Sequence, residues 1–301
     1  RQARGEARGM RHSMRHRRQV MDYFAFQWHI TEECDQRCKH CYIFAEGRPH
    51  TTEMPWEQMV AVLAAIEEMC RRMARRPYLY ITGGDPILHP RFWDLLELVR
   101  RHGIPFTLMG NPFHLTDAVC RRMKSLGCRK YQLSLDGLRE THDRLRKPGS
   151  YDATLQAIAT IRRSGMHCAV MSTVSAANID EIPELIDVIV EHQADIFAFA
   201  RYCPTSEDRA HQETWHVEPR RYRQFLARCW EKFTKYGASQ GAEREQHCDS
   251  GTTFNLKDHL WTLFLYETGR FVIPEGLDSD TIYGGCNCGN CHFTIGADGT
   301  L

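Results

Sequence analysis

The feature that most constrains the fold is a regular alternation of short apolar runs and amphipathic segments between residues 23 and 202. Strands that alternate with helices pair in parallel, because a crossover segment must return the chain to the same edge of the sheet. The sequence therefore predicts a parallel sheet with helices packed on it. The runs with the length and aromatic or β-branched content of strands cover residues 23–31, 78–81, 106–109, 131–135, 168–174 and 196–200.

The segments between these runs have the apolar spacing of amphipathic helices. Three of them end at Gly103, Gly127 and Gly165, where a helix commonly closes with a left-handed residue. Six strand–helix units fall short of the eight that close a full barrel. We therefore expect an α/β fold built on a partial, TIM-like (β/α)6 barrel, with its active site at the carboxyl ends of the strands. The expected helices cover residues 56–73, 90–102, 116–126 and 151–164.

Three cysteines follow the first strand with the spacing C-x3-C-x2-C, namely Cys34, Cys38 and Cys41. Thiolates are soft ligands that suit iron–sulfur clusters, Cu(I) or zinc. Three ligands leave a four-iron cluster one short, so one iron is free to bind a group that is not protein. The alternative is a zinc site completed by a fourth ligand such as His40.

The charge and the cysteine content limit the cellular compartment and the binding partners that we expect. Lys and Arg number 39 and Asp and Glu 38, so the net charge of +1 gives no overall field toward nucleic acid or a membrane. The longest apolar runs are far shorter than a membrane span. Thirteen cysteines, six of them in two tight clusters, favour metal ligation in a reducing cytoplasm over disulfides. We expect a cytoplasmic protein without a membrane or nucleic-acid partner.

The cysteine motif, with His40 before its last cysteine and Tyr42 after it, resembles the signature of the radical S-adenosylmethionine (SAM) enzymes. The resemblance implies a [4Fe-4S] cluster on Cys34, Cys38 and Cys41. It also implies that SAM binds the open iron and is cleaved by one electron to a 5′-deoxyadenosyl radical.

The next strand ends in Gly83-Gly84-Asp85-Pro86, which resembles the Gly-Gly-Glu-Pro motif whose backbone binds the SAM amino group in that family. Asp85 stands where Glu is usual, so only the backbone role carries over directly. Two adjacent glycines also let a ligand approach the backbone closely.

The passage from Ser134 to Asp152 resembles radical SAM peptide and protein maturases. The resemblance implies that Ser134 contacts the SAM ribose and that Arg146 binds the SAM carboxylate, with Arg144 as the other candidate. It further places Asn111, Thr173 and Tyr42 among the SAM contacts. Asp136 and Asp143 are interpreted as turn caps, and no catalytic residue is assigned.

The last stretch carries Cys286, Cys288 and Cys291 between glycines and small polar residues, a composition that suits a metal loop leading into a strand and an Asp-Gly turn. It resembles the opening of the SPASM/twitch extension, which implies at least one auxiliary iron–sulfur cluster. The second cysteine of that pattern would fall past Leu301, so we expect this domain to be incomplete. Cys248 is either a further ligand or uninvolved.

We therefore predict a basic arm over residues 1–20, a radical SAM barrel over 21–215, a helical linker over 216–275 and the start of an auxiliary cluster domain over 276–301. The resemblance implies a maturase that forms a thioether or carbon–carbon crosslink, or an oxidised residue, in a ribosomally made peptide or protein. A flavodoxin or ferredoxin would donate the electron. Two alternatives stay open, a radical SAM enzyme that acts on a small molecule or tRNA and a non-enzymatic zinc or redox-binding protein.

Overall fold

One continuous nine-stranded sheet forms the frame of the protein. The structure, a computed structural model, describes residues 23–44, 52–204, 214–237, 245–247, 251–271 and 288–301. The strand order is β7-β8-β6-β5-β4-β3-β2-β1-β9, and all neighbours are parallel except the β7–β8 pair. The strands are β1 (Tyr23–His29), β2 (Arg76–Thr82), β3 (Phe106–Met109), β4 (Cys128–Ser134), β5 (His167–Val174), β6 (Ile196–Arg201), β7 (Glu245–His247), β8 (Thr253–Asn255) and β9 (His292–Ile295).

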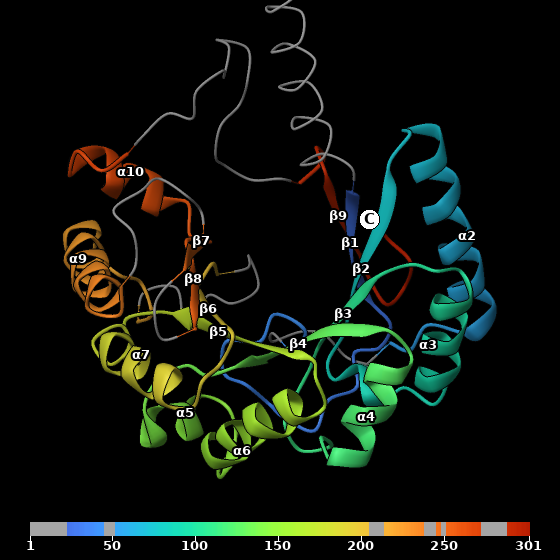
Figure 1. Ribbon diagram of the computed structural model, residues 1–301, viewed down its shortest axis with the longest axis horizontal. Coiled ribbons are helices and arrows are strands. Elements are labelled where there is room, and N and C mark those ends of the chain that lie inside the picture. Colours follow the sequence, from blue (N-terminus) through green and yellow to red (C-terminus); the bar gives the residue numbers. More distant parts are fainter. Residues whose placement is uncertain (1–22, 45–51, 205–213, 238–244, 248–250, 272–287) are drawn as a thin grey trace, which may run out of the picture.

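The sheet curls into an open half-barrel, and its helices cover the outside of the curve (Figure 1). Because each crossover helix joins two adjacent parallel strands, the helices follow one another around the arc. The helices are α2 (Trp56–Arg72), α3 (Phe92–Arg101), α4 (Asp117–Ser125), α5 (Arg139–Leu145), α6 (Ser150–Arg163), α7 (Ile182–Glu191), α9 (Pro219–Lys235) and α10 (Leu260–Glu267), with a 3-10 turn at Pro86–Leu88.

The core lies between the sheet and these helices. In α3 the buried residues Phe92, Leu95, Leu96 and Val99 form one stripe at helical spacing. Strand β1 alternates buried and half-buried residues, as expected for a strand with one face under a helix layer and one face toward the partly open interior. The sheet therefore leaves its concave face available for a site.

The six predicted strands are confirmed as β1 to β6, paired in chain order. Strand β4 begins at Cys128, earlier than the predicted residue 131, because the polar residues Arg129 and Lys130 hid its start. The three predicted helix-closing glycines, Gly103, Gly127 and Gly165, all have positive φ.

The sheet extends past the predicted six strands on both sides. Strand β8 adds in parallel to β6, and β9 adds in parallel to β1. The sequence predicted β9 and the turn after it, in which Gly296 donates a backbone hydrogen bond to Thr300. Strands β7 and β8 were not predicted, because three residues are too few to show a period.

The basic arm over residues 1–20 lies outside the described residues, and the division of the chain into domains stays a prediction. Within the described ranges, no helix combines the length and apolarity needed to cross a bilayer.

Replacing Leu133 tests the core at the central strand. Leu133 is fully buried in β4, so Leu133→Ala should lower the free energy of unfolding by about 2–5 kcal/mol. The matched control is Leu263→Ala on α10, where the side chain is 53% exposed and a change within about 0.5 kcal/mol is expected. Urea unfolding measures both, and equal effects of the two variants would contradict this description of the core.

Candidate functional site

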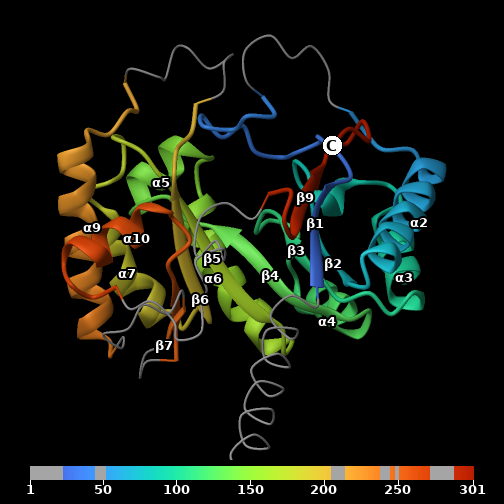
Figure 2. The ribbon, with the colours of Figure 1, turned by 90° about the horizontal axis from the view of Figure 1, so that it is seen from above.

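The three predicted cluster cysteines lie at the carboxyl edge of the sheet, on the loop that follows β1 (Figure 2). This loop runs across the strand ends toward α5, where the Lys39 backbone N–H donates to the Leu145 carbonyl. The Lys147 Nζ donates to the Asp35 carbonyl at 3.1 Å. The loop is therefore anchored on the far side of the half-barrel.

Gly83 and Gly84 lie directly against this loop. The Gly84 N–H donates to the Thr31 carbonyl at 2.8 Å, and the Asp85 N–H donates to the Glu33 carbonyl at 2.7 Å. A Cβ on Gly83 would lie 2.2 Å from the Thr31 oxygen, and one on Gly84 would lie 2.3 Å from the Glu33 oxygen. Both positions thus require glycine because the backbone that leads into the cysteine motif lies so close. The contact of these two glycines with SAM stays a prediction.

Hydrogen-bond donors point at two of the three sulfurs. The Asn111 Nδ2 donates to the Cys34 Sγ at 3.1 Å, and the Arg146 Nη1 donates to the Cys38 Sγ at 3.6 Å. Burial raises the pKa of the Cys34 thiol and raises that of Cys38 to about 11. Deprotonation of these thiols therefore needs a bound cation to compensate the buried charge, as a metal cluster does.

The spacing of the three sulfurs can be compared with that of a single zinc site. Tetrahedral ligands with Zn–S bonds of about 2.3 Å place the sulfurs roughly 3.8 Å apart. In the described part of the chain, the groups whose metal-binding atoms all lie within 4.8 Å of one another do not include the three cysteines. The three sulfurs therefore do not all lie within 4.8 Å of one another in this structure.

A buried ion pair between Arg146 and Asp136 contacts the cysteine loop at Cys38. The Arg146 Nε donates to the Asp136 Oδ2 at 2.5 Å, and the Asp136 Oδ1 accepts the Thr173 backbone N–H at 2.8 Å. Burial acts to raise the pKa of Asp136, but the charge of Arg146, joined at low pH by those of protonated His40 and His142, outweighs it and holds the pKa at about 2. Removal of one partner from such a pair usually costs about 3–5 kcal/mol.

Two histidines join this network in their neutral form. The His142 Nδ1 accepts the Asp136 backbone N–H at 3.0 Å, so that nitrogen carries no proton. The His40 Nε2 lies 3.3 Å from the Asp136 Oδ2. Burial lowers the pKa of both imidazoles to about 4, against the opposing charge of Asp136.

The other predicted SAM contacts divide into two groups. Asn111, Ser134 and Thr173 lie at or near the carboxyl ends of β3, β4 and β5, and the Thr173 N–H donates to the same Asp136 carboxylate that binds Arg146. Arg146 is the arginine that turns inward, whereas the Arg144 Nη2 donates to Thr141 at 3.2 Å.

Tyr42 lies apart from that group. It is 49% exposed, its hydroxyl lies 3.1 Å from the His29 Nε2, and it lines a cavity of about 730 Å³ near the end of β9.

Cys288 and Cys291 lie at the opposite edge of the sheet, where the parallel strands begin. The Cys291 backbone carbonyl accepts the Ala25 backbone N–H near the start of β1, and Cys288 lies three residues before Cys291 in the sequence. Because β1 spans seven residues at ~3.3 Å each, these thiols lie on the order of 20 Å from the first cysteine loop. Cys286 and Cys248 lie outside the described residues, so the auxiliary ligand set stays a prediction.

Sequence reasoning missed three side chains of this site. Asp136 was interpreted as a turn cap, but it is the buried partner of Arg146, whereas Asp143 does cap a turn by accepting the Gly149 and Tyr151 N–H groups. Asp35 and His114 were not singled out. The sequence signal that could have assigned Asp136 to the site was its position directly after a predicted strand.

The carboxylate of Asp85 is fully buried, and burial together with the charge of Asp35 raises its pKa to about 7. It belongs to a second group of polar side chains that adjoins the cysteine loop. Its backbone, by contrast, is held by the loop through Glu33.

The fold and the site together define a class of protein. Its members have a curled parallel half-barrel and a three-thiolate site on the loop after the first strand. Residues 28–189, more than half of the chain, match the family model described as the radical SAM superfamily. The chain belongs to this superfamily, which confirms the resemblance and implies a [4Fe-4S] cluster with SAM. The thiols and the donors aimed at them fit such a cluster.

Relatives with known roles match over part of their length. The chain is 24% identical over 173 residues to the Fe-coproporphyrin III synthase of Methanosarcina barkeri, and 25% identical over 171 residues to the mycofactocin maturase MftC of Mycolicibacterium smegmatis. These matches cover 57% and 56% of this chain. The chain spans only 42% of each relative.

The fold is similar to that of the solved structures of Streptococcus suis SuiB. Streptococcus suis SuiB bound to the precursor peptide SuiA superposes with a TM-score of 0.67 at 16% identity, over 93% of this chain and 58% of SuiB. SuiB bound to S-adenosylmethionine gives a TM-score of 0.65 at 17% identity, over 93% of this chain and 59% of SuiB.

The neutral His142 predicts a pH dependence. A histidine whose folded pKa is lowered from 6.5 to about 4 stabilises the fold fully above pH 6.5, and this stability is lost as the pH falls toward 4. For His142 alone the loss should reach ~2 kcal/mol by pH 5. Urea unfolding of the apoprotein between pH 8 and pH 5 measures the decline.

His142→Asn, whose side-chain oxygen can still accept the Asp136 N–H, should remove that part of the decline. His167→Asn is the matched control, because its side chain is 71% exposed. If His142→Asn and the wild type lose stability equally below pH 6.5, the assignment of a neutral His142 is wrong.

Proposed function

We propose that the chain is the catalytic half-barrel of a radical SAM maturase that modifies a ribosomally made peptide or protein. Cys34, Cys38 and Cys41 would hold the [4Fe-4S] cluster, and SAM would bind its open iron. When bound, these groups supply a 5′-deoxyadenosyl radical that abstracts hydrogen from the substrate, which ends as a thioether or carbon–carbon crosslink or an oxidised residue. A flavodoxin or ferredoxin is the proposed electron donor.

The chain's own residues position this chemistry. Asn111 and Arg146 direct N–H groups at Cys34 and Cys38, and hydrogen bonds to cluster sulfurs tune the reduction potential. The Arg146 Nε donates to Asp136, and one Nη donates to Cys38. The remaining N–H groups of this guanidinium are therefore the donors available to a SAM carboxylate. We propose that Gly83, Gly84, Asp85, Ser134, Thr173 and Tyr42 complete the SAM contacts.

The observation that carries the peptide assignment is the cavity beside Tyr42. It has a volume of about 730 Å³ and lies between the cysteine loop, β1 and the end of β9. Most of its lining residues carry hydrogen-bonding side chains, which suit a peptide backbone better than the apolar face of a macrocycle. The lining includes Gln27, His29, Glu32, Tyr42, Thr52, Thr294, Asp298 and Thr300. The likeness of the fold to SuiB, solved with its precursor peptide, supports the same assignment.

A small-molecule substrate is the second candidate, because the relatives include a Fe-coproporphyrin III synthase and AdoMet-dependent heme synthases. The tRNA alternative receives no comparable support. An auxiliary cluster on Cys286, Cys288 and Cys291, with or without Cys248, stays part of the proposal. The distance of Cys288 and Cys291 from the first cysteine loop suits electron relay or a structural role better than direct substrate contact.

Replacement of the three loop cysteines tests the cluster. Cys34→Ala, Cys38→Ala and Cys41→Ala combined should remove one cluster of iron and reduce the release of 5′-deoxyadenosine to background, because all three thiolates belong to the same centre. The control is Cys203→Ser, an exposed thiol outside the C-x3-C-x2-C motif, which should keep both. Iron content and chromatography after anaerobic reconstitution with SAM and dithionite measure the outcome. A triple variant that keeps its iron and its nucleoside release would refute the assignment.

Filling the cavity tests the substrate class. Thr294 is exposed on β9 and lines the cavity, so Thr294→Trp should raise the KM for a precursor peptide at least tenfold. SAM cleavage without substrate should change little. Thr262→Trp, exposed on α10, is the matched control. The peptides to assay are those encoded beside the gene, with mass spectrometry to detect loss of hydrogen, and a parallel assay uses iron-porphyrin precursors. Turnover of a porphyrin and of no peptide would favour the second candidate.

A further inference from the structure

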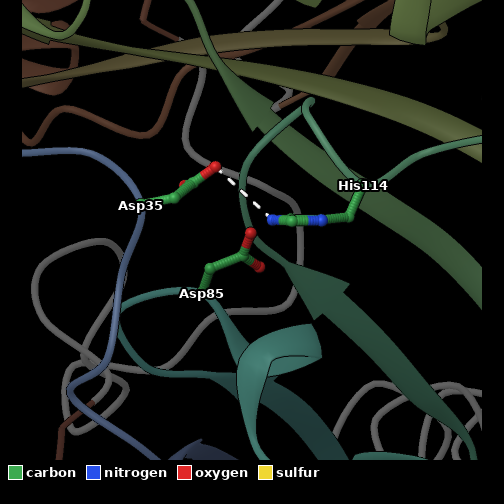
Figure 3. A group of neighbouring side chains, drawn as sticks. All are labelled: Asp35, Asp85 and His114. Carbon is green, nitrogen blue, oxygen red and sulfur yellow. Dashed lines mark ion pairs between the residues drawn. The ribbon is translucent and has the colours of Figure 1, made fainter.

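A second group of potential metal ligands lies next to the cysteine loop and contains no cysteine. Asp35, Asp85 and His114 each place a ligand atom within 4.8 Å of the others (Figure 3). They come from three separate loops, which follow β1, β2 and β3. The group therefore sits where the carboxyl ends of three parallel strands converge.

No charged side chain of the described residues pairs with Asp85. Its side chain is fully buried, and neither carboxylate oxygen forms a hydrogen bond of ordinary geometry among the described residues, although the backbone N–H groups of Asn111 and Ile87 approach it. Figure 3 shows this carboxylate below the Asp35–His114 pair, with one oxygen directed toward it. Because burial of an unpaired carboxylate is costly, such a group is normally neutralised, paired or bound to a metal.

The donors nearby are already engaged elsewhere. The Tyr131 hydroxyl donates to the Asn111 carbonyl at 3.2 Å, and the Asn111 Nδ2 donates to Asp35 and to Cys34. The Lys147 ammonium donates to the Asp35 backbone carbonyl and not to its carboxylate. Two carboxylates thus lie next to a thiolate loop, and among the described residues neither is paired with a lysine or arginine side chain.

The geometry of the ligands suits a small divalent ion. The His114 Nε2 lies 3.5 Å from the Asp35 Oδ2, close to the ~3.4 Å edge of a tetrahedron with metal–ligand bonds of ~2.1 Å. The Nε2 is itself buried and accepts or donates no hydrogen bond within the described structure, while the His114 side chain is 40% exposed overall.

We propose that Asp35, Asp85 and His114 bind a divalent first-row metal ion, separate from the iron–sulfur cluster. Two carboxylates and one imidazole suit Mn²⁺, Fe²⁺ or Zn²⁺, whereas Mg²⁺ and Ca²⁺ prefer oxygen alone. Since Asp35 directly follows Cys34, the ion ties the start of the cysteine motif to the loops after β2 and β3. It also offsets the negative charge that two carboxylates place beside the cluster.

The test is a titration of Mn²⁺ into protein whose clusters have been reconstituted anaerobically and whose loosely bound iron has been removed with a chelator. Mn²⁺ is the probe because it prefers oxygen and nitrogen ligands to thiolates. Loss of the free Mn²⁺ signal in electron paramagnetic resonance measures binding, without SAM and without turnover. We expect one Mn²⁺ bound with a Kd well below about 1 mM.

Asp85→Asn and His114→Gln should each weaken Mn²⁺ binding at least tenfold. Asp85→Asn replaces an unpaired buried charge by a neutral group, and His114 is partly exposed, so both variants should fold. The matched control is His167→Gln, an exposed histidine 3.8 Å from Asp195 at the start of β5, which should bind Mn²⁺ as the wild type does. The proposal is overturned if the wild type binds no Mn²⁺ below about 1 mM, or if both variants bind it as tightly as the wild type.

Discussion

The ion pair between Asp136 and Arg146 is the constraint on which the site depends. Asp136 directly follows β4, accepts a hydrogen bond from β5 through Thr173, and holds the guanidinium that reaches Cys38. One buried carboxylate therefore links two strands of the sheet to the metal loop. Its neighbours His40 and His142 stay neutral, so the network contains one positive and one negative charge at neutral pH. Because this network has no net charge, it can lie next to the thiolates without adding to their negative charge.

The route of the loop explains how sequence-distant groups meet. The backbone from Thr31 to Glu33 lies so close to β2 that only glycine fits at residues 83 and 84. From there the loop crosses to α5 and is held by Leu145 and Lys147. The strand ends, the glycines and the inward-turned arginine thus form one packed unit. A change in any one of them is expected to shift the sulfurs, and not only to remove a local contact.

The sequence predicted the frame of the protein well and the details of its site less well. Strands with strong apolar runs and helices that end in glycine were placed correctly, because both signals are local. The predicted cysteine motif was likewise local, and it lies at the edge where the strand order required it. By contrast, Arg146 and Arg144 are indistinguishable in sequence, and only the position of Asp136 in space selects one of them. Short strands such as β8 gain their stability from pairing with β6, and that long-range contact leaves no periodic pattern in three residues.

The position of β9 has a consequence for how the molecule is assembled. Strand β1 is synthesised before β9, and Ala25 pairs with His292 across a long stretch of sequence. Until residues 292–295 emerge from the ribosome, one flank of β1 presents unpaired backbone groups, which makes it a place where nascent chains can pair with one another. Closure of this long loop is also entropically slow. Strand β9 therefore acts as a cover that protects β1, and this flank of β1 becomes complete only after β9 has been synthesised.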